Sequence, residues 1–297
     1  MSGRPLMILE RDGVELGEIV PAAPLRRISL HGLTAAVQGP RILQRTVELV
    51  LRAYPAPEIG SGDDLTISAN RGTGSRKSWI ISSENFTQRA YSGVQEAARW
   101  VEWVFISEAL KRWDQFIHVH AGLVANSTQS ALLIGRSGSG KSTTTTALAL
   151  AGMQLYSDDV ALVHREGLRP ASAPRPIKLD PGARRLLRAH GLRLPRGSWL
   201  GESIDRTVIP GLPPVEEPGP PLTTAIFFAD QRLSTPVLRR LTSAEAVMRL
   251  VQQSVSETFD ASGPSSGAVN LINAIQCFEL AAGDLGSTVS VIQNLLA

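Results

Sequence analysis

The residues with the clearest chemical potential run from Ile134 to Thr143 and read IGRSGSGKST. They satisfy the Walker A spacing G-x-x-x-x-G-K-[ST]. In such a loop glycines let successive backbone N–H groups point at one anion, and the following helix adds its positive N-terminal end. The lysine reaches the β- and γ-phosphates, and the hydroxyl holds Mg²⁺. We therefore expect nucleotide binding by Gly135, Arg136, Ser137, Gly138, Ser139, Gly140, Lys141, Ser142 and Thr143.

Acidic and imidazole side chains flank this loop at short distances along the chain. His120 stands 21 residues before Lys141, and Asp158 and Asp159 follow Lys141 by 17 and 18 residues. The loop motif alone serves motors, switches, transporter ATPases and kinases, so its surroundings must discriminate among them. An aspartate pair this close predicts a compact site in which a neighbouring strand end faces the loop. Adjacent strand residues point to opposite faces, which predicts different roles for the two aspartates.

These segments resemble a known family. The segment HVHAGLV, a hairpin, GRSGSGKS, a helix ending in glycine and then SDDVAL are similar to the catalytic domain of bacterial HPr kinase/phosphorylase. The family's wider relatives include stand-alone serine kinases, some of which modify ribosomally made peptides such as lasso peptides. From His120 to Asp159 the resemblance needs no gap. It implies an α/β fold with a P-loop kinase core, shared more distantly with phosphoenolpyruvate carboxykinases.

The resemblance also implies residue roles. Lys141 binds phosphate and Ser142 holds magnesium. Asp159 takes the position of the carboxylate that accepts the proton of the substrate hydroxyl. His120 lies beside it and orients it or tunes its pKa. Asp158 binds the metal through water or anchors the turn. A serine hydroxyl is a poor nucleophile, so an adjacent base suits this chemistry.

The sequence departs from the family in one region. The signature Leu–Glu–Ile–Arg–Gly, whose glutamate binds metal, is replaced by RPIKLDPGARRLL. Asp180, Glu202 or Asp205 are the alternatives for that ligand. The glycine-rich substrate loop of the signature is absent too, so HPr as substrate and reverse phosphorolysis are not supported.

Three functions are consistent with these residues. The first is an ATP- and Mg²⁺-dependent kinase acting on a serine hydroxyl of a peptide or protein. The second is a small-molecule kinase with the same loop and base. The third is a nucleotide-responsive binding protein without transfer, although such a sensor needs neither Asp159 nor His120.

Secondary-structure patterns indicate the elements that must position these residues. Residues 1–115 read as a small α+β unit and residues 116–297 as the catalytic domain. In the latter we expect one strand over 116–125 and another ending at the loop, a helix ended by Gly152, and a strand over 153–163 that leads into a turn. A later helix begins at Thr242 or Ser243 with Glu245 near the capping-box position. Residues 210–221 read as a linker without structure.

The composition argues against several classes of protein. Apolar residues make up 43% of the chain and charged residues 19%, the net charge is only +3, and Cys277 is the single cysteine. No apolar run approaches the roughly 18 residues of a membrane span, and the first residues lack a secretory pattern. We expect a cytoplasmic protein that binds neither nucleic acid nor membrane, with a homo-oligomer as an open alternative. A run of basic residues between Arg169 and Arg196 is either a solvated helix face or a site for an acidic partner.

Overall fold

The computed structural model describes residues 24–72, 78–91, 93–194, 199–200, 207–209, 217–256 and 266–297. The chain divides into two compact units, one of residues 1–50 and 54–109 and one of residues 51–53 and 110–297. Both contain sheets and helices, so the fold is mixed α/β. The boundary expected between residues 115 and 116 falls inside the second unit, directly before its first strand.

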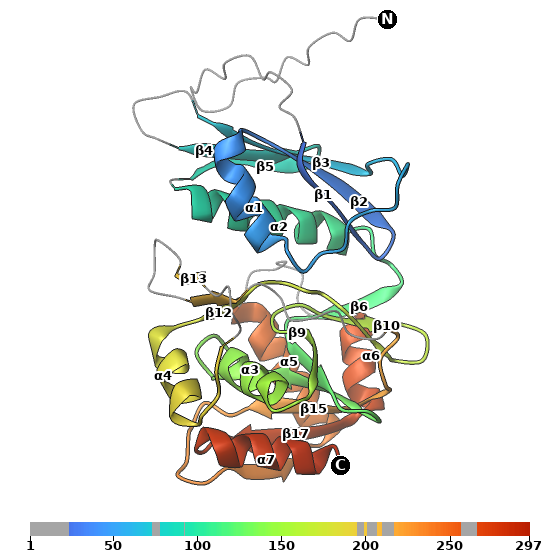
Figure 1. Cartoon of the computed structure of the whole chain (residues 1–297). Helices are drawn as coiled ribbons and strands as arrows, with labels where there is room; N and C mark the ends of the chain where they lie inside the picture. Colours follow the sequence, from blue (N-terminus) through green and yellow to red (C-terminus); the bar gives the residue numbers. More distant parts are fainter. Residues whose placement is uncertain are drawn as a thin grey trace, which may run out of the picture. The chain divides into compact units, whose positions relative to one another are not determined.

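The first unit is a five-stranded sheet with two α-helices (Figure 1): β1 (Pro24–Leu30), β2 (Leu33–Gln38), the 3-10 turn η1 (Arg41–Leu43), α1 (Gln44–Val50), β3 (Leu65–Arg71), β4 (Trp79–Ser83), β5 (Phe86–Tyr91) and α2 (Val94–Leu110). The strands follow the order β1-β2-β3-β4-β5. His31 and Gly32 form the tight turn between β1 and β2, with positive φ angles of 47° and 81°. A two-residue turn with positive φ angles matches the right-handed twist of the paired strands. β2 and β3 are parallel and are connected through α1.

The second unit is built on a six-stranded mixed sheet in the order β16-β17-β15-β8-β7-β9. β8 and β15 are parallel, as are β15 and β17. The bounds of its members are β7 (Gly122–Ala125), β8 (Ser130–Ile134), β9 (Gln154–Ser157), β15 (Leu222–Phe228), β16 (Val237–Arg240) and β17 (Gln276–Ala281). The unit's helices are α3 (Lys141–Leu150), α4 (Pro181–Ala189), α5 (Ser243–Ser256), α6 (Ser266–Ala274) and α7 (Leu285–Leu295).

Helices cover both faces of this sheet. Alternate residues of β8 enter two separate cores: Leu132 and Ile134 pack in the cluster that holds buried residues of α5 and α6. Ala131 and Leu133 pack in the cluster that holds those of α3, α4 and α7. All of β8 is buried for this reason, as expected for a strand between two helical layers. No helix among the described residues is long and apolar enough to cross a bilayer.

Two small three-stranded sheets complete the second unit. One has the order β11-β10-β6 and the other β12-β14-β13. Their strands are β6 (Phe116–Val119), β10 (Ala161–His164), β11 (Pro170–Ala171), β12 (Ile177–Leu179), β13 (Trp199–Leu200) and β14 (Thr207–Ile209). β6 precedes the glycine-rich loop in the chain and β10 follows it. These two strands pair, so they lie side by side.

The single strand expected over residues 116–125 is wrong. The chain forms β6, breaks at His120 and Ala121, and resumes as β7 in the large sheet. The sequence does not reveal this break, because both halves have strand character and most of their residues are buried. β10 and α6 are also separate elements that the sequence patterns did not predict.

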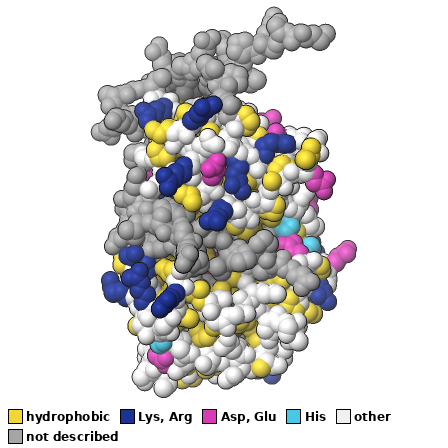
Figure 2. Space-filling model, viewed as in Figure 1, with side chains coloured by type: hydrophobic (Ala, Val, Ile, Leu, Met, Phe, Trp, Pro, Cys, Tyr) yellow, Lys and Arg dark blue, Asp and Glu magenta, His cyan; other side chains and the backbone are white. Residues whose placement is uncertain are grey.

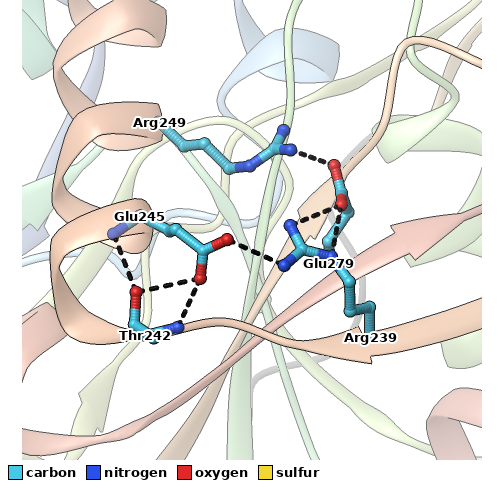
Figure 3. A network of polar contacts seen from close by, with 5 residues as sticks. All are labelled: Arg239, Thr242, Glu245, Arg249 and Glu279. Carbon is cyan, nitrogen blue, oxygen red and sulfur yellow. Dashed lines mark hydrogen bonds and ion pairs between the residues drawn. The ribbon is translucent and has the colours of Figure 1, made fainter.

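The predicted capping box at the start of α5 is confirmed with Thr242 as the cap (Figure 3). Thr242 N–H donates to Glu245 Oε2 at 2.8 Å, and Glu245 N–H donates to Thr242 Oγ1 at 3.3 Å. Arg239 joins this pair to the sheet, because it donates to Glu245 Oε1 at 2.7 Å and to Glu279 Oε2 at 3.0 Å. Arg249 of α5 donates to the same Glu279 carboxylate. Charge-assisted bonds thus tie α5 to β16 and β17.

The basic run divides into buried and solvated members. Arg185 and Arg188 of α4 are exposed, and Figure 2 shows basic side chains gathered over this helix at the lower left. Arg175, by contrast, is only 6% exposed. The part of the run on α4 is therefore a solvated helix face, and Arg175 belongs to the interior. Arg196 and residues 210–216 of the expected linker lie outside the described residues.

Candidate functional site

The glycine-rich loop of residues 135–140 connects the end of β8 to the start of α3. Gly138 and Gly140 have φ angles of 83° and 99°, in the region that favours glycine. The first hydrogen bond of α3 runs from Thr144 N–H to the Gly140 carbonyl at 2.9 Å, so the amides of residues 141–143 precede it. These amides and the helix dipole place positive partial charge beside the loop. The strand–loop–helix context that a phosphate-binding loop requires is present.

Other predicted loop residues differ in exposure. Arg136, Ser137 and Gly138 are exposed, whereas Ser139 and Thr143 are half-buried. Arg136 Nη1 lies 3.9 Å from Asp230 Oδ2 in the segment that follows β15, with both side chains largely in solvent. Such exposed ion pairs contribute little to stability.

A second arginine from the same segment lies against the loop. β8 and β15 are parallel, so the segments after them meet at one edge of the sheet. Arg232 Nη2 approaches the Ser139 carbonyl oxygen at 3.4 Å. A Cβ added at Gly140 would come within 2.5 Å of the same nitrogen. The sequence patterns did not single out Arg232, because its place depends on strand pairing.

Lys141 and His120 meet at the mouth of the loop. Lys141 is only 7% exposed, and its Nζ lies 2.7 Å from His120 Nε2. His120 stands at the break between β6 and β7, which frees its backbone from the sheet ladder and lets the ring turn toward α3. The predicted convergence of the upstream histidine and the loop lysine is therefore present in the geometry.

Asp159 completes a row of polar groups that begins at Lys141. Its Oδ1 lies 3.3 Å from His120 Nδ1, and Arg175 Nη1 donates to its Oδ2 at 2.5 Å. Burial alone would raise the pKa of Asp159. Four basic side chains outweigh burial, so the pKa lies below its ordinary value: Arg175, His120, Lys141 and Lys178. The carboxylate is therefore ionised at neutral pH.

Asp158 points to the other face of the turn, as expected for adjacent residues on an extended segment. It is 7% exposed, and Thr145 Oγ1 of α3 donates to its Oδ1 at 2.5 Å. Burial raises the pKa of Asp158, and hydrogen bonds from the side chains of Thr145 and Ser142 oppose that rise. Asp158 and Ser142 thus lie together on the α3 side, apart from the row containing Asp159.

The sequence patterns did not identify two buried residues of this site. Arg175 was counted only within the basic run, yet it fixes Asp159. Thr145 lies in a run of four threonines, and the only available signal was its position one helical turn after Lys141, on the same face of α3. Thr145 also fills the space above Gly122 of β7, where a Cβ would overlap its Cγ2 methyl group.

The site offers few metal ligands of its own. Among the residues that the structure describes, no group of three or more His, Cys, Asp or Glu side chains could hold a metal ion. Mg²⁺ in nucleotide sites needs only one or two protein oxygens beside phosphates and water, and the adjacent Ser142 hydroxyl and Asp158 carboxylate fit that requirement. The alternative ligand Asp180 is instead the N-cap of α4, since its side chain accepts from Ala183 N–H at 2.7 Å. Glu202 and Asp205 lie outside the described residues.

The sequence matches neither the models of known protein families nor any curated protein. The geometry of the residues themselves therefore has to support any functional conclusion.

Proposed function

We propose that this protein is an ATP-dependent kinase with a P-loop kinase core that transfers the γ-phosphoryl group to a serine hydroxyl of a peptide or protein. The observation that carries the proposal is the row Lys141–His120–Asp159, in which a phosphate-binding lysine lies 2.7 Å from an imidazole that in turn lies 3.3 Å from an ionised carboxylate. A site that only binds nucleotide needs the lysine but not the acid–base pair.

The nucleotide's triphosphate fits the loop for electrostatic reasons. The N-terminal amides of α3 and the Lys141 ammonium supply positive charge where the β- and γ-phosphates would lie. Phosphoryl transfer itself depends chiefly on positioning and on neutralising charge. Lys141 and the loop backbone therefore carry the binding part of the mechanism.

Mg²⁺ would be held by Ser142 and Asp158. When bound, it neutralises phosphate charge and orients the phosphates for displacement. Thr145 holds the Asp158 carboxylate in place by its hydrogen bond. This arrangement separates metal binding on one side of the turn from proton transfer on the other.

The pair formed by Asp159 and His120 supplies the base for the acceptor hydroxyl. Both side chains reach solvent, with 39% and 27% of their surfaces exposed, so an acceptor can approach them. Arg175 keeps the carboxylate oriented from the opposite side. The resemblance of residues 120–159 to HPr-kinase-related serine kinases points in the same direction, and ATP and Mg²⁺ are both abundant in the cytoplasm, which we propose as the compartment.

A small-molecule acceptor is the second candidate. The region that carries the substrate signature in the resembling family is different here, so the acceptor is selected by other residues. Transfer chemistry is common to both candidates, and only the acceptor differs.

The proposal is tested by incubating the protein with γ-labelled ATP, Mg²⁺ and a library of serine-containing peptides, followed by mass spectrometry. We expect a phosphoserine product with wild-type protein and none with Lys141→Ala. Labelled small molecules in place of peptides would favour the second candidate. Nucleotide binding without transfer to peptide, small molecule or water would contradict a kinase.

A further inference from the structure

The two ring nitrogens of His120 face different groups, and these neighbours favour one tautomer of the ring. Nε2 lies 2.7 Å from Lys141 Nζ. A lysine ammonium has three donors and no acceptor, so Nε2 accepts and carries no proton. When the ring is neutral, Nδ1 therefore holds the proton, and this nitrogen faces Asp159 Oδ1 at 3.3 Å.

Asp159 is held from both sides. Its Oδ1 faces the imidazole, while its Oδ2 accepts from Arg175 at 2.5 Å. The Arg175 side chain is only 5% exposed, so the surrounding core keeps its guanidinium in place. Both carboxylate oxygens thus have partners whose positions are set by the fold, which suits a group that orients an imidazole.

The exposed part of the ring lies away from Asp159. The His120 side chain is 27% exposed, yet its Nδ1 atom is buried. Solvent and an incoming acceptor therefore reach other atoms of the ring. Nε2 is the other ring nitrogen, and it lies beside Lys141 in a part-buried contact.

We propose that His120 Nε2, oriented by Asp159 behind Nδ1, is the atom that takes the proton from the acceptor hydroxyl. The inference rests on the proposed function and assigns the proton to the other member of its base pair. Bound ATP draws the Lys141 ammonium onto phosphate oxygens, which leaves the Nε2 lone pair facing the γ-phosphate. Asp159 is then a positioning residue that also stabilises the imidazolium.

The acceptor oxygen forms a bond to the γ-phosphorus, and the bond from that phosphorus to the β–γ bridging oxygen breaks. The electron pair of the broken bond stays on ADP. The acceptor proton passes to Nε2, and the resulting imidazolium loses it to solvent after product release.

Chemical rescue distinguishes the two assignments, with release of labelled phosphate from γ-labelled ATP to water as the probe reaction. We expect His120→Ala to lose about 10²–10⁴-fold in rate, the typical contribution of a general base. Added imidazole should restore activity in a saturable way, because it fills the vacated space and supplies the basic nitrogen. Asp159→Ala should not respond to acetate in this manner.

His120→Asn is the matched variant. Its amide N–H can still face Asp159 as Nδ1–H does, but it has no basic atom. We expect activity as low as in His120→Ala without imidazole rescue, while ATP affinity and the unfolding temperature stay near wild type. His118→Asn, at an exposed position on β6, should retain full activity.

Two results would overturn this inference alone. One is near wild-type hydrolysis by His120→Asn, since orienting Asp159 would then suffice. The other is failure of imidazole to accelerate His120→Ala in protein that binds ATP normally. Wild-type protein that binds ATP but transfers phosphate to neither water nor peptide would instead contradict the proposed function itself.

Discussion

Thr145 Oγ1 of α3 lies 2.5 Å from Asp158 Oδ1, and both groups are buried. Together with a hydrogen bond from the Ser142 side chain, this hydrogen bond supports a carboxyl group that is otherwise in a low-dielectric environment. It also joins the helix after the glycine-rich loop to the turn after β9. The two parts of the proposed metal site are therefore fixed to each other by a residue that would not itself touch the metal.

Replacing Thr145 by valine tests this link. Valine keeps the shape but removes the hydroxyl, so Asp158 loses the hydrogen bond from Thr145 Oγ1. We expect the free energy of unfolding to fall by about 1–3 kcal/mol. The gain in ATP affinity on adding Mg²⁺ should also shrink, as measured by calorimetric titration with and without the metal. Thr145→Ser keeps the hydroxyl and should retain the Mg²⁺ effect.

Gly122 of β7 should be coupled to Thr145. An alanine at this position would place its Cβ against the Thr145 Cγ2 methyl group. We expect Gly122→Ala to destabilise the protein by about 1–3 kcal/mol, as overpacking does. Combining it with Thr145→Ser, which lacks that methyl group, should recover part of the loss in denaturant unfolding. Strictly additive effects in this double-mutant cycle would show that the two side chains do not interact.

Lys141→Ala removes the ammonium beside the loop. Because hydrogen bonds between charged groups are among the stronger polar contacts, we expect ATP affinity to fall about 10–100-fold. Phosphoryl transfer should fall further. Fluorescence titration with a labelled nucleotide measures the first effect. Lys111→Ala, at an exposed position after α2, should leave affinity unchanged, and an equal loss there would point to nonspecific electrostatics.

Glu245 gives a pH-dependent prediction for the unit that holds the site. Hydrogen bonds from Arg239 and from Thr242 lower the pKa of Glu245 from 4.5 to about 2. A lowered folded-state pKa stabilises the fold above the unfolded value, and this contribution is lost as pH falls from about 4.5 toward 2. Glu245→Gln should therefore lower the unfolding temperature at pH 7 more than at pH 3. Glu166→Gln in an exposed turn serves as the control, and an equal deficit at both pH values for Glu245→Gln would contradict the expectation.

The local parts of the site could be predicted from the sequence, because they depend on residues close together in the chain. The loop, the helix after it and the opposite directions of Asp158 and Asp159 follow from glycine placement and strand alternation. Arg175 could not be predicted, since its contact with Asp159 depends on the tertiary path of the chain between β11 and β12. The pairing of an arginine with one particular carboxylate leaves no periodic pattern in a single chain.

The strand pattern failed for a related reason. Residues 116–125 are apolar enough to be one buried strand, and nothing in that pattern says that its halves join different sheets. α6, in contrast, carried a usable signal in Ala268, Leu271 and Ile272, whose three- and four-residue spacing is helical. The strand over 116–125 was wrong because tertiary pairing divides it. α6 was not predicted because its helical periodicity was overlooked.

The break between β6 and β7 gives His120 an unusual dependence on the rest of the fold. The ring is carried by a two-residue joint whose ends belong to separate sheets, so the packing between those sheets sets its distance from Asp159. Leu123 of β7 and Ala161 of β10 lie in one shared core, so we expect substitutions there to shift that distance. Reaction rate in this protein would then be tunable from the hydrophobic interior, with every polar residue of the site left in place.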